Sequence, residues 1–162
     1  MPIIIRTMQS TDVEAVEQVA INSWHATYEG IIPKQIQDNF LAMAYNKKML
    51  QKRLEQTPFY VAEENGKIIG FANFSNVKDQ GEVELAAIYL LPEAQCKGVG
   101  SKLLTFGIKQ LLPKAVYINV ESDNQVGKQF YLARNFKIID EFEEDFDGYL
   151  LQTTRMVLEV LR

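Results

Sequence analysis

Hydrophobic residues along the chain follow two different spacings, which divide it into strands and helices. Runs rich in β-branched and aromatic residues predict strands at 2–8, 83–91, 115–121, 136–144 and 152–160. Apolar residues that recur every three or four positions predict helices at 10–30, 100–112 and 124–135. The segment 34–56 fits one broken helix or two short ones.

The middle of the chain contains two further strand features. Asn65-Gly66 lies between two apolar runs within 59–77, which is the strongest short-range indication of a β-hairpin. The run VELAAIYLL at 83–91 is apolar at nearly every position, which predicts a strand buried on both faces. The resulting order is β-α-α-β-β-β-α-β-α-β-β, with hairpins first and βαβ units after them. It predicts a mixed sheet with helices on its faces.

Composition narrows the class of protein to one compact globular domain. The chain has 162 residues, 47% of them hydrophobic and 23% charged, without a linker, repeat or low-complexity tract. Its net charge of −4 and its pI near 5.1 disfavour a nucleic-acid partner. The longest apolar run, 85–91, is too short to span a membrane, and the first residues lack the pattern of a signal peptide. We therefore expect a cytoplasmic protein without a membrane partner.

The counts of cysteine and histidine limit the metal and disulfide chemistry of the chain. Cys96 is the only cysteine and His25 the only histidine. One cysteine excludes an intramolecular disulfide and a cysteine cluster for zinc, and one histidine disfavours a histidine-based metal site. We expect no bound metal.

A glycine-rich loop joins the strand at 83–91 to the helix after it. The sequence YLLPEAQCKGVGSKLL contains Gln95-x-x-Gly98-x-Gly100 at this junction. The unpaired N–H groups and the dipole of a helix's first turn favour a bound anion. The spacing fits neither G-x-G-x-x-G, because Leu103 stands at the third position, nor G-x-x-x-x-G-K-[ST]. The alternative is a loop whose glycines serve only a tight turn.

The segment NQVGKQFYLARNF at 124–136 carries a second motif. Together the two motifs resemble those of the GNAT superfamily of acetyl-CoA-dependent N-acetyltransferases, [Q/R]-x-x-G-x-[G/A] and N-x-x-A-x-x-F-Y-x-x-x-G-F. The matching residues of the second motif are Asn124, Phe130, Tyr131 and Phe136. Gly127 replaces the usual alanine and Asn135 the usual glycine, and Asn is the next-best residue for a left-handed conformation.

The order of elements also resembles that of the superfamily from end to end. The resemblance implies an α/β (α+β) fold, with one GNAT-like N-acetyltransferase domain over residues 1–162. Its sheet would be mixed and mostly antiparallel, with about seven strands and four or so flanking helices. The sheet would be splayed at its central strand.

The resemblance implies acetyl-CoA as the co-substrate and assigns residues to hold it. A strand splayed at a bulge would leave backbone groups free for the pantetheine arm at Ile88, Tyr89 and Leu90. The pyrophosphate would lie on the glycine loop, at Gln95, Cys96, Lys97, Gly98, Val99, Gly100 and Ser101. Asn124 and Tyr131 would contact the cofactor as well, and Arg134 would reach its nucleotide end.

Acetyl transfer requires a deprotonated amine, a stabilised oxyanion and a proton for the departing thiolate. The resemblance implies Tyr131 as the general acid, with the adjacent Phe130 filling the core; the alternative makes Tyr131 a core aromatic. Glu84 is the candidate base, because charged residues seldom enter an apolar strand without a partner or a task. Glu82 is one alternative, and a chain of waters without a dedicated carboxylate is another.

The acceptor side is predicted from SWHATYEGIIP at 23–33, which resembles a W-x-x-x-Y-x-G-x-x-P stretch in a subgroup of the superfamily. Trp24 and Tyr28 lie four residues apart on one helix face. With His25 they are the candidate substrate-binding residues. Trp24 also falls on the apolar stripe of its helix, and His25 is equally consistent with a half-exposed surface position. No carboxylate is evident at a spacing that would orient His25.

Acidic residues gather near the C-terminus, at Asp140, Glu141, Glu143, Glu144, Asp145 and Asp147. Such a run can attract a polycation, although it is also typical of a solvated hairpin. It makes a polyamine the leading candidate among the acceptors.

We therefore expect an acetyl-CoA-dependent N-acetyltransferase that acts by direct attack in a ternary complex. The acceptor would be the primary amine of a small molecule, such as a polyamine or an amino-acid-like amine, or the α-amine of a peptide. Two other hypotheses are a non-catalytic acyl-CoA binding module or sensor, and a phosphate binder on an unrelated α/β fold. The closing strands suit a homodimer, although the sequence does not determine the oligomeric state.

Overall fold

The computed structural model describes residues 2–160, which form a seven-stranded sheet and five α-helices. The strands are β1 (Ile3–Thr7), β2 (Phe59–Glu64), β3 (Lys67–Phe74), β4 (Glu82–Leu90), β5 (Ala115–Glu121), β6 (Lys137–Phe146) and β7 (Tyr149–Glu159). The helices are α1 (Val13–Tyr28), α2 (Lys34–Ala44), α3 (Lys47–Gln56), α4 (Val99–Leu111) and α5 (Gln125–Ala133). The elements follow the predicted order, with 34–56 forming two helices. None of the helices in the described part of the chain is long and apolar enough to cross a membrane.

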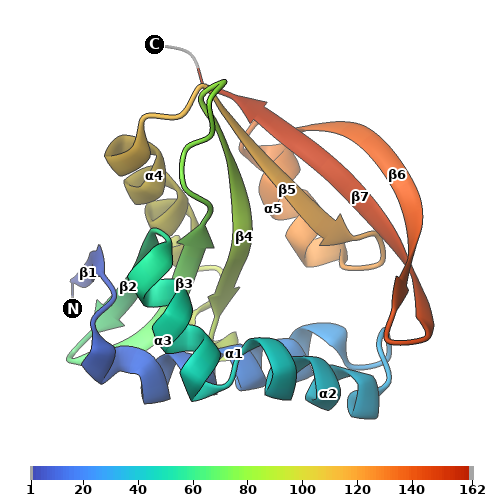
Figure 1. The fold of residues 1–162 in the computed structure, drawn as a ribbon, viewed down its shortest axis with the longest axis horizontal. Helices are drawn as coiled ribbons and strands as arrows, with labels where there is room; N and C mark the ends of the chain where they lie inside the picture. Colours follow the sequence, from blue (N-terminus) through green and yellow to red (C-terminus); the bar gives the residue numbers. More distant parts are fainter. Residues whose placement is uncertain (1, 161–162) are drawn as a thin grey trace.

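The sheet has the order β1-β2-β3-β4-β5-β7-β6 and is divided by a fork in its middle. Neighbouring strands are antiparallel except β4 and β5, which are parallel. These two strands pair only where Glu82–Glu84 meets Ala115–Tyr117, and they then diverge. Figure 1 shows the resulting V, with α1 and α2 running across its open end. The predicted mixed, mostly antiparallel sheet, splayed at its central strand, is confirmed.

The tight turn between β2 and β3 follows directly from its two residues. Asn65 and Gly66 have positive φ angles of 54° and 77°, which few other residue types adopt readily. Two such residues in succession suit the twist of a two-residue hairpin. The predicted hairpin is confirmed.

A bulge in β4 lies close to the point where the fork opens. Leu85 and Ala87 pair with the consecutive residues Phe74 and Asn73 of β3, so Ala86 is an extra residue in β4. An extra residue bends a strand and increases its local twist. The bulge therefore helps to turn β4 away from β5.

β4 is not buried on both faces, which corrects the expectation from its apolar sequence. Val83, Leu85 and Ala87 are buried, whereas Ala86 is exposed and Ile88–Leu90 is half-buried. The difference arises because β5 has left β4 beyond Glu84 and no strand covers that edge. Apolar side chains in this part of β4 line an opening instead of a core.

Helices cover both faces of the first half of the sheet. Phe71 of β3 contacts Tyr45, which follows α2, with ring centroids 6.3 Å apart. On the other face, Phe74 packs closely on Gly107 of α4, and Tyr60 contacts Phe106 at 5.1 Å between centroids. This packing fixes the position of α4, whose N-terminus carries the glycine loop.

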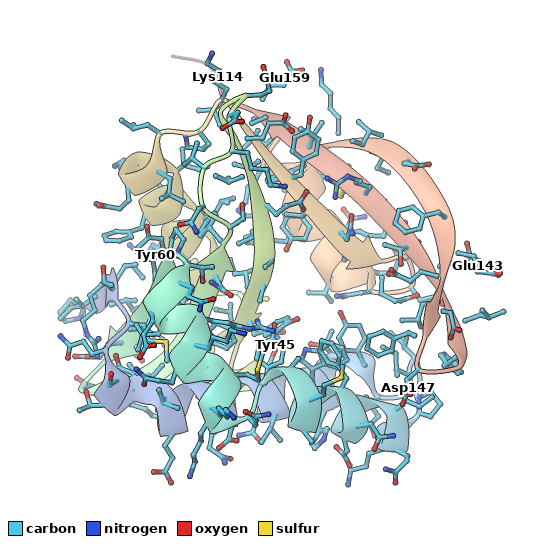
Figure 2. All side chains as sticks on the ribbon, viewed as in Figure 1. Tyr45, Tyr60, Lys114, Glu143, Asp147 and Glu159 are labelled. Atoms are coloured by element: carbon cyan, nitrogen blue, oxygen red, sulfur yellow. The ribbon has the colours of Figure 1, made fainter. Side chains whose placement is uncertain are left out.

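The β6–β7 hairpin closes over the first helices at the open end of the V. Figure 2 shows Asp147 at the tip of this hairpin beside α2, and Glu143 on the outer strand β6. Asn39 of α2 donates a hydrogen bond to Asp147 at 3.2 Å, and the Tyr149 hydroxyl donates to the carbonyl of Ile31 at 3.1 Å. The acidic run predicted as a solvated hairpin therefore forms part of β6 and its turn.

Candidate active site

The fork between β4 and β5 contains a cleft of about 560 Å³. Its walls come from α1, β4, the glycine loop, the start of α4, β5 and α5. The predicted cofactor residues that line it are Ile88, Tyr89, Leu90, Gln95, Cys96, Gly98, Val99, Gly100, Ser101, Asn124 and Tyr131. Trp24, Tyr28 and Arg134 line it too. Lys97, His25 and Glu84 are not among its lining residues.

The glycine loop presents unobstructed backbone at the start of α4. Gly98 precedes the helix with a φ of 80°, and no atom lies within 4 Å of the position that a Cβ would occupy. Cys96 also has a positive φ, of 64°, and its side chain is exposed. The N-terminus of a 13-residue helix is thus open to a ligand at Gly98, an arrangement that favours anions.

Gly100, the second glycine of the loop, is required for a different structural reason. A Cβ at Gly100 would lie 2.9 Å from the Phe130 ring of α5. Gly100 is therefore needed for the close approach of α4 and α5, while Gly98 keeps the loop open. One motif thus serves both helix packing and access to the helix N-terminus.

We expect Gly98→Ala to weaken acetyl-CoA binding by about 3- to 10-fold, because the added methyl group narrows the approach to the helix N-terminus. Gly66→Ala is the matched control, since Gly66 has a φ of 77° and also no atom near the position of a Cβ. Both changes should cost about 1 kcal/mol of stability through backbone strain. Calorimetric titration with acetyl-CoA compares the two variants, and equal affinities would mean that the loop does not hold the phosphates.

Tyr131 lies deep in the cleft wall. Its side chain is buried, and its ring packs edge-on against Phe136 with centroids 5.2 Å apart. Burial raises the pKa of the Tyr131 hydroxyl above its usual value, and the nearby Tyr28 adds to this effect. The hydroxyl therefore stays protonated at neutral pH, as a proton donor requires.

The sequence favours Phe130 for the core and Tyr131 for the site, but the structure does not divide the two side chains in this way. Tyr131 is the more buried of the two, Phe130 is only half-buried, and both line the cleft. The Arg134 guanidinium lies 3.8 Å from the centre of the Phe130 ring and donates to the Phe130 carbonyl at 2.8 Å. Arg134 thus packs over the Phe130 ring, which the core buries only in part.

Asn124 caps α5 and reaches the cleft from there. Its Oδ1 accepts a hydrogen bond from the Gly127 N–H at 3.0 Å. A Cβ at Gly127 would lie 2.7 Å from the Asn124 amide nitrogen. Glycine in place of the usual alanine therefore leaves room for this position of the Asn124 side chain.

Trp24 and Tyr28 form the wall of the cleft on the side of α1. Their ring centroids are 4.6 Å apart, and Trp24 also stacks on Phe40 at 4.7 Å. Burial raises the pKa of Tyr28 to about 12, and the adjacent Asn124 side chain offsets part of the increase. Trp24 is buried and also lines the cleft, so it belongs both to the apolar stripe of α1 and to the cleft wall.

Glu84 lies beside the fork in an ion pair with Arg155 of β7. The closest nitrogen and oxygen atoms are 2.5 Å apart. Arg155 also donates to Asn119 of β5 at 2.9 Å and lies over the Tyr117 ring. The negative charge of Glu84 is thus balanced within the protein, which does not favour the role of base that the sequence suggested.

His25 faces a second cavity, also of about 560 Å³, between the α1–α2 loop and Tyr149. Its Nε2 lies 2.8 Å from Oδ1 of Asp38 in α2. The sequence gives no sign of this partner, because Asp38 is 13 residues from His25 and approaches it only through the packing of α1 on α2. The structure therefore separates His25 from the other two candidate substrate-binding residues.

We expect His25→Ala to leave kcat within about twofold of the wild type and to affect at most the KM of the acceptor. The His25–Asp38 pair is largely exposed, so its loss should cost less than about 1 kcal/mol. Steady-state kinetics with one amine acceptor checks this. A collapse of kcat with every acceptor tested would restore His25 as a catalytic candidate.

Several residues of the site could not be found from motifs. Asn119 and Val120 of β5 line the cleft, and Arg155 holds Asn119 from the neighbouring strand. Asn119 and Val120 lie in an ordinary apolar strand that carries no motif. Only the pairing of β5 with β7 brings Arg155 opposite Asn119. Among residues 2–160 there is no group of three or more His, Cys, Asp or Glu side chains that could hold a metal ion.

Known proteins are similar to this chain in sequence and in fold. Residues 20–136 match the acetyltransferase (GNAT) family. The chain is 29% identical over 155 residues to a spermidine N(1)-acetyltransferase of Thermoplasma acidophilum, covering 90% of this chain and 95% of that one. It is 28% identical over 144 residues to the peptidyl-lysine N-acetyltransferase YiaC of Escherichia coli, covering 85% of each.

A solved structure extends this similarity to the whole fold. The PaiA N-acetyltransferase from Thermoplasma acidophilum in complex with coenzyme A superposes with a TM-score of 0.85 at 27% identity, over 99% of this chain and 100% of that one. The sequence match from 20 to 136 also includes the walls of the cleft on α1, β4, the glycine loop and α5. The chain therefore belongs to the acetyltransferase (GNAT) family.

Proposed function

We propose that the protein transfers the acetyl group of acetyl-CoA to a primary amine by direct attack in a ternary complex. One observation carries this proposal: a single cleft runs between the splayed β4 and β5, from the glycine loop to the aromatic wall on α1. Such a cleft gives two substrates separate approaches to one point between the strands. Acetyl transfer to an amine requires this arrangement, because both reactants must be held in contact.

Acetyl-CoA would occupy the part of the cleft near the glycine loop. The open helix N-terminus at Gly98 suits the pyrophosphate. Ile88, Tyr89 and Leu90 pair with β3 on one side only, and no strand pairs with their other edge. Free N–H and C=O groups at a strand edge suit the amide groups of a pantetheine arm.

The acetyl group would then lie near Tyr131, with the amine arriving from the side of Trp24 and Tyr28. The amine nitrogen attacks the thioester carbon, and the C–S bond breaks. Tyr131, which burial keeps protonated, would give its proton to the departing thiolate. This account keeps the general-acid role that the sequence suggested for Tyr131.

The proposed acceptor is a small polycationic amine of the polyamine class. The relative at 29% identity is a spermidine N(1)-acetyltransferase and covers nearly all of both chains. The exposed carboxylates of β6 lie on the strand next to β7 and would raise the local concentration of a cation near the open end of the fork. A lysine side chain of a peptide is the other candidate, since the relative at 28% identity acts on peptidyl-lysine.

An acceptor panel tests the proposal. We expect kcat/KM for spermidine to exceed that for a lysine-containing peptide and for free amino acids, and to fall as salt screens the carboxylates. The readout is CoA release together with mass spectrometry of the acetylated product. A preference for the peptide would reject the polyamine class, and acetyl-CoA binding without CoA release would favour the non-catalytic binding module.

A homodimer through the closing strands remains a prediction. β6 is one of the two edge strands of the sheet, and its exposed carboxylates include Asp140, Glu141, Glu143, Glu144 and Asp145. Pairing two such edges would bring like charges together, which opposes edge-to-edge association. A dimer that uses this edge should therefore become tighter at high salt, which analytical ultracentrifugation measures.

A further inference from the structure

Glu121 is a buried carboxylate that none of the roles above uses. It is the last residue of β5, and only 8% of its surface is exposed. Asn119 and Val120 before it and Asn124 after it line the cleft. Glu121 therefore lies beside the cleft, at the turn that leads from β5 into α5.

The Glu121 carboxylate forms no ion pair with the part of the chain that the structure describes. Its Oε2 accepts a hydrogen bond from the Asp123 N–H at 2.8 Å. Within residues 2–160, no nitrogen of a lysine, arginine or histidine side chain lies within 4 Å of this carboxylate. The other buried acid, Asp12, is paired with Arg6. Since burial of an unpaired charge is costly, Glu121 is suited to a cation from outside the chain.

Glu121 also acts on the side of the cleft where the amine is expected. Burial of the Tyr28 hydroxyl raises its pKa, and the negative charge of Glu121 raises this pKa further. Tyr28 lines the cleft beside Trp24, and the Asn124 side chain acts on the same hydroxyl. An ammonium group beside Tyr28 would therefore be attracted electrostatically to the Glu121 carboxylate.

We propose that Glu121 receives the ammonium group of the acceptor and takes its proton, which makes it the base of the reaction. The inference rests on the proposed function. One N–H bond of the ammonium breaks, its electron pair stays on nitrogen as the attacking lone pair, and the proton passes to the carboxylate. The nitrogen then attacks the thioester carbon, the C–S bond breaks and the thiolate takes a proton from Tyr131. The nitrogen gives up its second proton, which restores the Tyr131 hydroxyl, and Glu121 returns its own proton to solvent.

Glu121 fits this role better than Glu84 does. The Glu84 carboxylate is already neutralised by Arg155, whereas Glu121 forms no ion pair with any residue from 2 to 160. Burial raises the pKa of Glu121, and a base is more effective when its pKa is closer to the operating pH. The sequence offered no reason to choose Glu121, because it ends an ordinary strand and belongs to neither motif.

Other charged groups face Glu121 and act on its titration. Besides burial, which raises the pKa of Glu121, the hydrogen bond from the Asp123 N–H lowers it and the charge of the Asp123 carboxylate raises it. Lys128 of α5 lowers it, and Tyr28 interacts with Glu121 from α1. From β7 its pairing partner is Thr153, whose hydroxyl donates to Glu144 of β6 at 2.8 Å. Because the proposed base must be ionised, kcat/KM of the wild type should rise with pH until Glu121 has lost its proton.

The test compares Glu121→Gln with Glu159→Gln, which removes the same charge at the far end of β7, where Figure 2 places Glu159. Glutamine can still accept the Asp123 N–H hydrogen bond, so the turn should remain intact. We expect Glu121→Gln to lower kcat/KM for spermidine about 10- to 100-fold at pH 7, while Glu159→Gln stays at wild-type activity. The deficit should narrow as pH approaches the pKa of the amine, about 10, because free amine no longer needs a base.

Two further measurements separate a catalytic role from a structural one. Glu121→Gln should melt at the wild-type temperature or above it and should bind acetyl-CoA as the wild type does, since it removes only a buried charge. Equal activity and an unchanged pH profile in Glu121→Gln would overturn the inference, because a residue that only caps the turn keeps its hydrogen bond in this variant. Absence of acetyl transfer by the wild type itself would instead refute the proposed function.

Discussion

Replacing Tyr131 with phenylalanine is expected to lower kcat by about 10- to 100-fold, because the departing thiolate loses its proton donor. The ring packing against Phe136 does not involve the hydroxyl, so the variant should fold as the wild type does. The Kd of acetyl-CoA should change little. Rapid-quench measurement of acetyl transfer in a single turnover isolates the chemical step from product release.

Tyr60→Phe is the control for the loss of one buried hydroxyl. Tyr60 is buried between Phe74 and Phe106, on the face of the sheet packed by α4, and is not part of the cleft lining. We expect its kcat to match that of the wild type. Unchanged single-turnover rates in Tyr131→Phe would remove Tyr131 as the acid and leave it as a wall of the cleft.

Gly107→Ala is expected to lower the free energy of unfolding by about 1–3 kcal/mol, because overpacking a filled core forces its neighbours to move. A Cβ at Gly107 would overlap the Phe74 ring, and both residues are buried. The loss should appear even though alanine favours a helix over glycine by about 1 kcal/mol. Urea denaturation, with the m-value checked for each variant, measures the change.

A second substitution can show that Phe74 is the cause. Phe74→Leu alone should destabilise the protein by leaving a cavity beneath α4. In the double variant the alanine methyl group partly fills that space, so the two losses should not add. Strict additivity of the two free-energy changes would mean that α4 packs on β3 in a different way.

Much of the fold could be predicted because it depends on residues close together in sequence. The turn at Asn65-Gly66 needs two residues that accept positive φ, and the start of α4 needs an open residue at Gly98. The partial exposure of β4 could not be predicted in the same way. An apolar strand that lines a ligand cleft and one buried in a core have the same sequence pattern, and only the loss of pairing beyond Glu84 distinguishes them.

The sequence predicts which residues lie together in the cleft where one motif supplies them, and it does not do so where distant elements meet. The glycine loop and Tyr131 fall together in the cleft as their motifs implied. The ion pair of Glu84 with Arg155 joins residues 71 positions apart and depends on the register of β7 along β5. Sequence alone shows a charged residue in an apolar strand, but it does not show whether another side chain neutralises that charge.

The central claim is that the cleft brings acetyl-CoA and an amine together for direct transfer. The most direct test is an initial-velocity experiment in which acetyl-CoA and spermidine are both varied, with CoA release and N-acetylspermidine measured in parallel. The account predicts one product molecule for each CoA released and intersecting double-reciprocal lines, as for a ternary complex. Parallel lines, which indicate an acetylated enzyme intermediate, or acetyl-CoA binding without CoA release, would contradict it.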